Sequence, residues 1–219
     1  MYLPEAFAET RLPVLHDAID AGGLAIFVTI AHGAPTATHV PMLLSRDEGP
    51  LGTVHFHLAR ANPQWQASSG TALVIFPGPD GYVSPSAYPA KAEHGRVVPT
   101  WNYVTVHASG TPEFYHDAGR LHALVSRLTA RHEARQPAPW AVTDAPAAYT
   151  AQMLRAIVGV ALRIDTLHGK WKLGQNRSKA DQVGLLAFYD AQGPAYEPMA
   201  EMTRERSKGQ GSALDPLGP

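Results

Sequence analysis

Side chains that suit a phosphate group follow one predicted strand. Residues 51–58 alternate as a strand does, and Arg60, Ala61, Asn62 and Trp65 come directly after it. A guanidinium fork, an amide and free backbone N–H groups at the end of a strand are the donors that a phosphate monoester needs. Each charge-assisted hydrogen bond contributes about 1.5–3 kcal/mol, so two or three would fix a phosphate. The alternative, that Arg60 only caps a loop, stays open.

A second candidate site consists of small polar residues on a predicted strand, Thr36, Ala37, Thr38 and His39. Thr36 and Thr38 share one face, and His39 points to the opposite one. Small side chains let a planar ring lie close to backbone N–H and C=O groups, which can bond its polar edges. The alternative is an ordinary half-buried strand.

An aromatic strand is predicted over residues 98–107. Trp101 and Tyr103 fall on one face with Thr105 and His107, while Asn102 falls on the other with two valines. The aromatic face is too polar for a core and suits a flat aromatic ligand with hydrogen-bonding edges. An interface with another chain would have the same composition.

A third cluster, residues 170–177, places three cations within eight residues, together with a tryptophan and two amides. As a site, Lys172, Gln175, Asn176 and Arg177 would supply donors and positive charge beside a ring system. As a surface segment, the same residues would be solvated. His55 and His57 share a strand face, but no third ligand at matching spacing is evident, so we expect no metal site. No catalytic set is evident either.

The totals restrict the class of protein. The chain has 219 residues, no cysteine, a formal charge of −1 and an isoelectric point near 6.8. Disulfides and thiol chemistry are therefore excluded, and no overall basic field attracts nucleic acid. No run approaches the roughly 20 apolar residues of a membrane span. We expect a globular protein of the cytoplasm, with no membrane association.

Many consecutive strands with helices at the margins predict a mainly β (α+β) barrel. Strands are expected at 24–30, 36–44, 51–58, 71–76, 98–107 and 157–167, and helices at 11–21, 117–135, 145–155 and 180–189. Residues 77–81 should end a strand, and 82–97 should form a long loop. We expect one domain over residues 1–190 and a flexible tail over 191–219.

Five segments in register resemble the PaiB family, whose members are described as FMN-binding negative transcriptional regulators. The resemblance runs from Met1 to about Phe188 and rests on the segments 37–41, 57–65, 75–86, 98–107 and 172–177, beside the opening Met1–Pro4. It implies a split β-barrel of the pyridoxamine-phosphate-oxidase/FMN-binding type, with peripheral helices, that forms a homodimer and binds flavin at the subunit interface.

The resemblance also implies one ligand for all the polar clusters. FMN would offer its phosphate to Arg60 and Asn62, its ring edges to the backbone of residues 36–39, and its ring face to Trp101 or Tyr103. Lys172 or Arg177, which in a dimer could belong to the other subunit, would stabilise the anionic reduced flavin. Two positions depart from the family, since Ala87 replaces a frequent aromatic residue and Gly174 a common serine.

Three functions follow as hypotheses. The first is a flavin-binding regulator that acts through flavin or a protein partner, because the sequence shows no helix-turn-helix and no basic arm for direct DNA reading. The second is a flavin-dependent reductase or oxidase of a small molecule, by analogy with the fold. The third is a cofactor-free dimeric interaction module.

Overall fold

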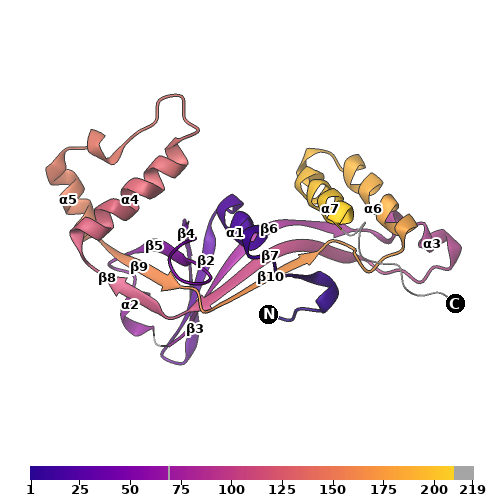
Figure 1. Cartoon of the computed structure of the whole chain (residues 1–219), viewed down its shortest axis with the longest axis horizontal. Helices are drawn as coiled ribbons and strands as arrows, with labels where there is room; N and C mark the ends of the chain where they lie inside the picture. The colour runs from indigo at the N-terminus through magenta and orange to yellow at the C-terminus, as the bar shows by residue number, and fades with distance from the viewer. Residues whose placement is uncertain (69, 210–219) are drawn as a thin grey trace. The chain divides into compact units, whose positions relative to one another are not determined.

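The computed structural model describes residues 1–68 and 70–209, and the chain divides into two compact units (Figure 1). The first, here called the central unit, comprises Thr10–Pro77 and Val106–His168. The second, here called the terminal unit, comprises Met1–Glu9, Gly78–Thr105 and the chain from Gly169 onward. The single domain predicted over residues 1–190 is thus built from two units, each with its own packing.

The central unit contains most of the strands. They are β2 (Ala25–Ala31), β3 (Ala34–Val40), β4 (Leu43–Ser45), β5 (Thr53–Ala59), β8 (Pro112–Tyr115) and β9 (Ile157–Arg163). Its helices are α1 (Leu12–Ala21), α2 (Gln64–Ala67), α4 (Ala118–Glu133) and α5 (Ala147–Arg155), with the 3₁₀ turn η3 (Val142–Asp144). Three strands have residues in both units: β6 (Ala72–Val83), β7 (Thr100–Gly110) and β10 (Thr166–Lys172).

The terminal unit adds shorter elements and two helices. They are η1 (Glu5–Phe7), β1 (Ala8–Glu9), η2 (Pro85–Ala87), α3 (Ala90–Glu93), α6 (Lys179–Ala191), η4 (Pro194–Tyr196) and α7 (Glu197–Gly209). Among the described residues the strands form two sheets, of order β1-β10-β7-β6-β2-β3 and β4-β5-β9-β8. The pairings recorded between neighbouring strands are antiparallel, as in a barrel built from hairpins.

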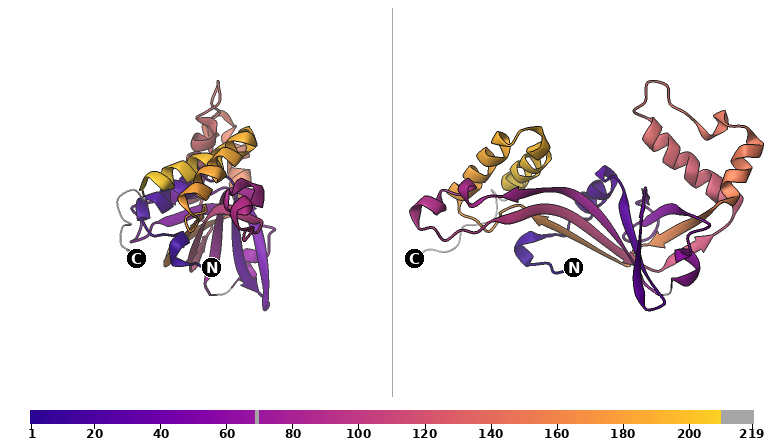
Figure 2. Two further views of the ribbon diagram at one scale, coloured as in Figure 1. Left: turned by 90° about the vertical axis from the view of Figure 1, so that its right-hand side faces the viewer. Right: turned by 180° about the vertical axis from the view of Figure 1, so that it is seen from behind.

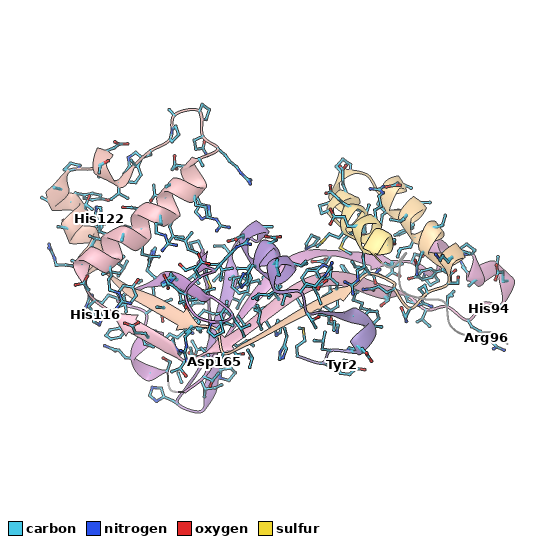
Figure 3. All side chains as sticks on the ribbon, viewed as in Figure 1. Tyr2, His94, Arg96, His116, His122 and Asp165 are labelled. Carbon is cyan, nitrogen blue, oxygen red and sulfur yellow. The ribbon has the colours of Figure 1, made fainter. Side chains whose placement is uncertain are left out.

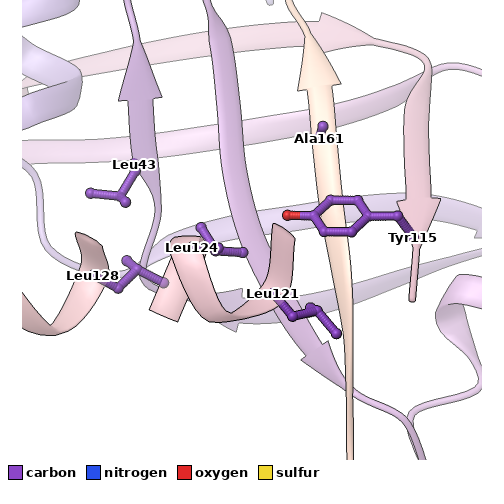
Figure 4. Close-up of a cluster of buried hydrophobic side chains, with 6 residues drawn as sticks. All are labelled: Leu43, Tyr115, Leu121, Leu124, Leu128 and Ala161. Carbon is purple, nitrogen blue, oxygen red and sulfur yellow. The ribbon is translucent and has the colours of Figure 1, made fainter. Parts of the chain in front are cut away.

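The core of the central unit follows the alternation of β5. Val54, Phe56 and Leu58 are buried, and the ring of Phe56 meets that of Phe27 edge-on, with centroids 4.8 Å apart. On the opposite face of this sheet, α4 contributes three leucines to a second cluster (Figure 4). Its members are Leu43, Tyr115, Leu121, Leu124, Leu128 and Ala161.

In the terminal unit, helices cover one face of the strands. Figures 1 and 2 show α6 and α7 over the same side of β6, β7 and β10. Asn102 and Val104 of β7 are buried, whereas Trp101 is 56% exposed, as the alternation predicted. Asn102 Nδ2 donates to the Tyr189 hydroxyl at 2.9 Å, and burial raises the pKa of Tyr189 to about 12.

The strand boundaries differ from the sequence-based expectation at two places. β6 continues through residues 77–81, where a proline- and glycine-rich run had indicated a turn. A Cβ on Gly78 would lie 2.9 Å from the Val104 carbonyl oxygen, so this glycine permits two strands to approach closely. The single strand expected over 157–167 is divided between β9 and β10. At the break, the backbone N–H of Ile164 donates to the Gly52 carbonyl and that of Asp165 to the Ser109 carbonyl.

The expected long loop and flexible tail also contain regular structure. Residues 82–97 include η2 and α3. The described part of the predicted tail forms η4 and α7, which buries Met199, Ala200 and Thr203. Met199 and Thr203 are four residues apart and therefore share one helix face. Residues 210–219 of that tail lie outside the described residues.

Candidate functional site

Arg60 occupies a corner where the end of β5 meets the start of β9. Its Nε donates to the Arg155 carbonyl at 2.6 Å and its Nη2 to the Ile157 carbonyl at 3.2 Å. The Trp65 indole N–H donates to the Arg60 carbonyl at 3.0 Å and holds the loop from the other side. The two carbonyls use two of the five guanidinium N–H groups, so three remain for a ligand.

The corner around Arg60 is rich in positive charge. Arg155 is exposed beside it, and residues 57–65 and 153–159 contain no Asp or Glu. Within the described chain, neither Arg60 nor Arg155 forms an ion pair of the recorded kind. A fixed guanidinium with free donors and no nearby carboxylate in these segments is suited to a phosphate or another compact anion.

Asn62 and Thr38 belong to a hydrogen-bonded network in the central unit. Asn62 Nδ2 donates to Thr38 Oγ1 at 3.0 Å, and Thr38 Oγ1 donates to Gln64 Oε1 at 2.6 Å. The Gln64 backbone N–H donates to Asn62 Oδ1 at 2.9 Å and closes the ring. The loop after β5 is therefore attached to β3 through side chains.

β3 presents the residues of the second predicted cluster at a sheet edge. It is the last strand of its sheet in the described chain, and Ala37 and His39 are exposed. An edge strand has one row of backbone N–H and C=O groups without a strand partner. Within residues 36–39, however, the Thr36 carbonyl already accepts a hydrogen bond from Gln64 Nε2 at 3.1 Å. Trp65 packs edge-on against His116 of the same unit, at 5.1 Å between centroids (His116 is labelled in Figure 3).

The aromatic face of β7 lies in the terminal unit. Trp101 meets Tyr82 edge-on at 6.0 Å, and both rings are substantially exposed. Lys170 is 7% exposed, and its ammonium lies 5.2 Å from the Tyr103 ring centroid and 5.5 Å from that of Tyr2. Figure 3 shows Tyr2 on the side of the strands away from α6 and α7. This open sheet face thus combines aromatic rings with buried positive charge.

Lys172 lies on the same face of β10 as Lys170. Its ammonium donates to the Thr100 hydroxyl at 2.5 Å and to the Trp101 carbonyl at 2.7 Å. Burial lowers the pKa of Lys172, and the charges of Lys170 and Arg177 act in the same direction. One ammonium N–H remains for a ligand.

Three of the other predicted residues of the terminal unit, Asn102, Gln175 and Arg177, have partners within the fold. Asn102 is buried on the helix-covered face, away from Trp101. Gln175 bonds the backbone of Leu173 and Trp171, and the Arg177 guanidinium stacks 4.6 Å from the Tyr88 ring centroid. Asn176 is exposed. The buried Asn102 is thus placed to stabilise the unit, whereas Trp101 is exposed and Lys172 is half-buried.

The fifteen predicted residues fall into two groups, one in each unit, and in the terminal group Asn102 lies on the opposite strand face from Trp101. The central group contains Thr36, Ala37, Thr38, His39, Arg60, Ala61, Asn62 and Trp65. The terminal group contains Trp101, Asn102, Tyr103, Lys172, Gln175, Asn176 and Arg177.

Sequence reasoning missed three residues beside these groups. Gln64 joins the central network through partners more than 20 residues away, which no local pattern reveals. Arg155 is the last residue of α5 and could not be placed beside Arg60 without the β5–β9 pairing. Lys170 had a usable signal, since it lies two residues before Lys172 and so shares its strand face.

No metal centre is indicated by the part of the chain that the structure describes. It contains no group of three or more His, Cys, Asp or Glu side chains arranged to hold a metal. His55 Nε2 lies 2.6 Å from a carboxylate oxygen of Glu48. No helix within residues 1–68 and 70–209 is long and apolar enough to cross a membrane.

Comparison with known proteins identifies the family. The family model described as "Putative FMN-binding domain" matches residues 1–166, about three quarters of the chain, and the chain belongs to this family. It is 28% identical to the protease synthase and sporulation protein PAI 2 of Bacillus subtilis, over 96% of this chain and 100% of that protein. An uncharacterized protein of Emericella nidulans is 30% identical, over 95% of this chain and 98% of the relative. The resemblance to the PaiB family is thereby confirmed.

Solved structures confirm the fold. The flavocytochrome Anf3 of Azotobacter vinelandii aligns with a TM-score of 0.55 at 16% identity, over 75% of this chain and 69% of that one. The FAD and heme binding protein of Mycobacterium smegmatis aligns with a TM-score of 0.54 at 21% identity, over 85% and 80%. The predicted split β-barrel with peripheral helices is therefore the fold of this chain.

The residues present fit the cofactor of the family. FMN has a phosphate, polar ring edges and a flat ring system. Within the central unit, Arg60 has guanidinium donors free for the phosphate, and β3 is an edge strand. FMN, the cofactor that the sequence predicted, agrees with the family to which the chain belongs.

Proposed function

We propose that the chain is a homodimeric FMN-binding protein in which Arg60 binds the flavin phosphate. The observation that carries this proposal is the guanidinium of Arg60, which two carbonyl groups hold in place while three N–H donors stay free. A preset guanidinium loses little side-chain entropy when it binds an anion, which favours affinity. FMN, when bound, would supply the redox chemistry.

The other predicted residues take supporting roles in this proposal. The backbone of Thr36–His39 bonds the polar edges of the ring, and Asn62 offers its remaining amide N–H to the phosphate. Trp101, Tyr103 and Lys172 form the aromatic and cationic face available to a ring system or to a second subunit. The exposed Trp101 and Tyr82 rings support a second copy of the chain as a partner, because exposed aromatic clusters are typical of interfaces.

A regulatory role through flavin or a protein partner is the function that the family relationship supports. PAI 2 of Bacillus subtilis is named for protease synthesis and sporulation, and a similar role here would act in the cytoplasm. Direct DNA reading has little support, since the chain carries a formal charge of −1. A gel-shift that showed specific, salt-resistant DNA binding by the purified protein would contradict this part of the proposal.

A flavin-dependent reductase or oxidase is the second candidate. The observation that favours it is Lys172, a partly buried amine of lowered pKa with one free N–H beside the exposed Trp101. Such an amine is placed to orient, or to exchange a proton with, an acceptor oxygen of a small substrate. An activity assay must identify the compounds that serve as reductant, oxidant and substrate.

Two measurements separate the candidates. Protein incubated with FMN and passed through gel filtration should retain the flavin absorbance at one FMN per chain, in a peak with the mass of a dimer. If the protein peak contains no flavin, the only remaining hypothesis is the cofactor-free interaction module. Addition of NADH or NADPH to the loaded protein then tests catalysis, because an enzyme should lose the oxidised flavin absorbance and regain it with an acceptor. Absorbance that no donor changes would reject the enzyme candidate.

A further inference from the structure

The side chain of Gln64 is almost completely buried, although it is a polar amide at the start of α2. It is 1% exposed, and its Nε2 donates to Phe27 O, Thr29 Oγ1 and Thr36 O at 3.3, 3.1 and 3.1 Å. The two N–H groups of Nε2 thus serve three acceptors, which lie on the two strands β2 and β3. Buried amides need such partners, because an unpaired buried donor or acceptor destabilises the fold.

The oxygen of the same amide is connected to the loop after β5, which carries Arg60 and Asn62. Gln64 Oε1 accepts from the Thr38 hydroxyl, which in turn accepts from Asn62 Nδ2. One side chain therefore connects both elements of the central group, the β3 edge and the loop after β5.

From this arrangement we infer that Gln64 is a positioning residue for the flavin site, with Thr38 as its relay rather than a ligand contact. The inference rests on the proposed function. It assigns a role to a residue that no sequence pattern singled out, and it changes the role predicted for Thr38.

The network also fixes the orientation of the Asn62 amide. The Gln64 backbone N–H can only donate, so it requires Asn62 Oδ1 as its acceptor. Asn62 Nδ2 is then directed at Thr38 Oγ1, and one of its two N–H groups is left over. Asn62, two residues after Arg60, thereby keeps a free donor and not a free acceptor, as a phosphate oxygen requires.

Thr38 has little hydrogen-bonding capacity left for a ligand. Its hydroxyl proton goes to Gln64, and one of its lone pairs accepts from Asn62. Its contribution to binding is therefore expected to depend on the hydroxyl group and not on the methyl group, since only the hydroxyl transmits the orientation.

Gln64→Glu tests the inference through pH, because it keeps the shape of the side chain. The ionised carboxylate cannot donate to the carbonyls of Phe27 and Thr36, whereas the protonated acid can donate one bond. The FMN affinity of the Gln64→Glu protein should be weaker than that of the wild type by about tenfold or more at pH 8 and should recover at pH 5. The ratio of the two dissociation constants at each pH is the readout, since the FMN phosphate titrates with both proteins.

A matched control separates positioning from loss of stability. Leu128→Ala removes a buried side chain from the α4 cluster of the same unit, and should lower the free energy of unfolding while it leaves FMN affinity unchanged. If Gln64→Glu does not fold, Thr38→Val and Thr38→Ser replace it. The valine should weaken FMN binding by about fivefold, and the serine should retain wild-type affinity.

The outcomes are distinct. Wild-type protein that does not bind FMN would refute the proposed function. Wild-type protein that binds FMN, together with folded Gln64→Glu protein of wild-type affinity at pH 8, would overturn the role of Gln64. If Leu128→Ala weakens FMN binding as much as Gln64→Glu does, the role of Gln64 is stability alone. Equal FMN affinities of the Thr38→Val and Thr38→Ser proteins would show that the Thr38 hydroxyl does not act as a relay.

Discussion

Replacement of Arg60 by alanine should weaken FMN binding and leave riboflavin binding unchanged. Riboflavin has the same ring and sugar-alcohol chain but no phosphate, so it reports every contact except the one assigned to Arg60. Three guanidinium N–H donors remain after the bonds to the Arg155 and Ile157 carbonyls. One charge-assisted bond contributes about 1.5–3 kcal/mol, so the dissociation constant for FMN should rise by about 10- to 150-fold.

The assay is an equilibrium titration of both flavins by fluorescence or calorimetry. The variant also loses two bonds to backbone carbonyls, which lowers its free energy of unfolding by about 1 kcal/mol for each bond. Thermal unfolding must therefore confirm that the protein is folded at the titration temperature. Arg163→Ala is the matched control, because Arg163 is an exposed arginine of the same unit that pairs with Asp165 at 3.8 Å. It should leave both affinities unchanged.

Two results would refute the reasoning about Arg60. An FMN affinity equal to that of the wild type would show that the phosphate binds elsewhere. An equal loss for FMN and riboflavin would show that Arg60 acts through the fold of the corner and not through the phosphate.

Three further predictions concern stability. His57 has a buried Nδ1 without a partner, and burial lowers its pKa below 6.5, so the folded state disfavours its protonation. The free energy of unfolding is highest above about pH 6.5 and falls by up to about 1.4 kcal/mol per pH unit as the pH decreases toward the folded pKa. Denaturant titrations of His57→Gln should lack this decrease. An identical pH dependence of the two proteins would contradict the prediction. Gly174→Ser should cost about 1–3 kcal/mol in the same titrations, because Gly174 has φ +83° and a Cβ would lie 2.9 Å from Leu185 Cδ2; an unchanged midpoint would show that the backbone relaxes. Asn102→Ala leaves the buried Tyr189 hydroxyl without its donor and should cost about 1–3 kcal/mol; a smaller change would mean that water replaces the amide.

The sequence predicted the strands and helices whose pattern is local. The alternation of Trp101, Asn102 and Tyr103 has a period of two and identified both faces of β7 correctly. The run of residues 77–81 was interpreted as a turn, because proline and glycine usually end a strand. The close approach of Val104 to Gly78, which explains the continuous β6, is a contact between distant segments that composition cannot show.

The candidate site was predictable where residue type determines chemistry and not where distant contacts do. Arg60 was selected as a donor at a strand end, and the structure adds the carbonyls that hold it. Asn102 was selected for its polarity, but its burial beneath α6 depends on Tyr189, which lies 87 residues further along the chain. Gln64 could not be distinguished from other loop amides for the same reason.

Helix α7 shows that some missed structure did carry a signal. Met199 and Thr203 lie one helical turn apart in a segment otherwise rich in charge, and both are buried. The charged residues and the glycine and proline residues near this segment indicated a flexible tail, and they outweighed that short apolar pattern.

A structure of the chain crystallised with FMN would test the central claim most directly. We predict one FMN per chain in a dimer, with a phosphate oxygen within hydrogen-bonding distance of the Arg60 guanidinium and a ring edge on the backbone of residues 36–39. A flavin phosphate bound away from Arg60, or dimeric crystals grown with excess FMN that contain none, would contradict it.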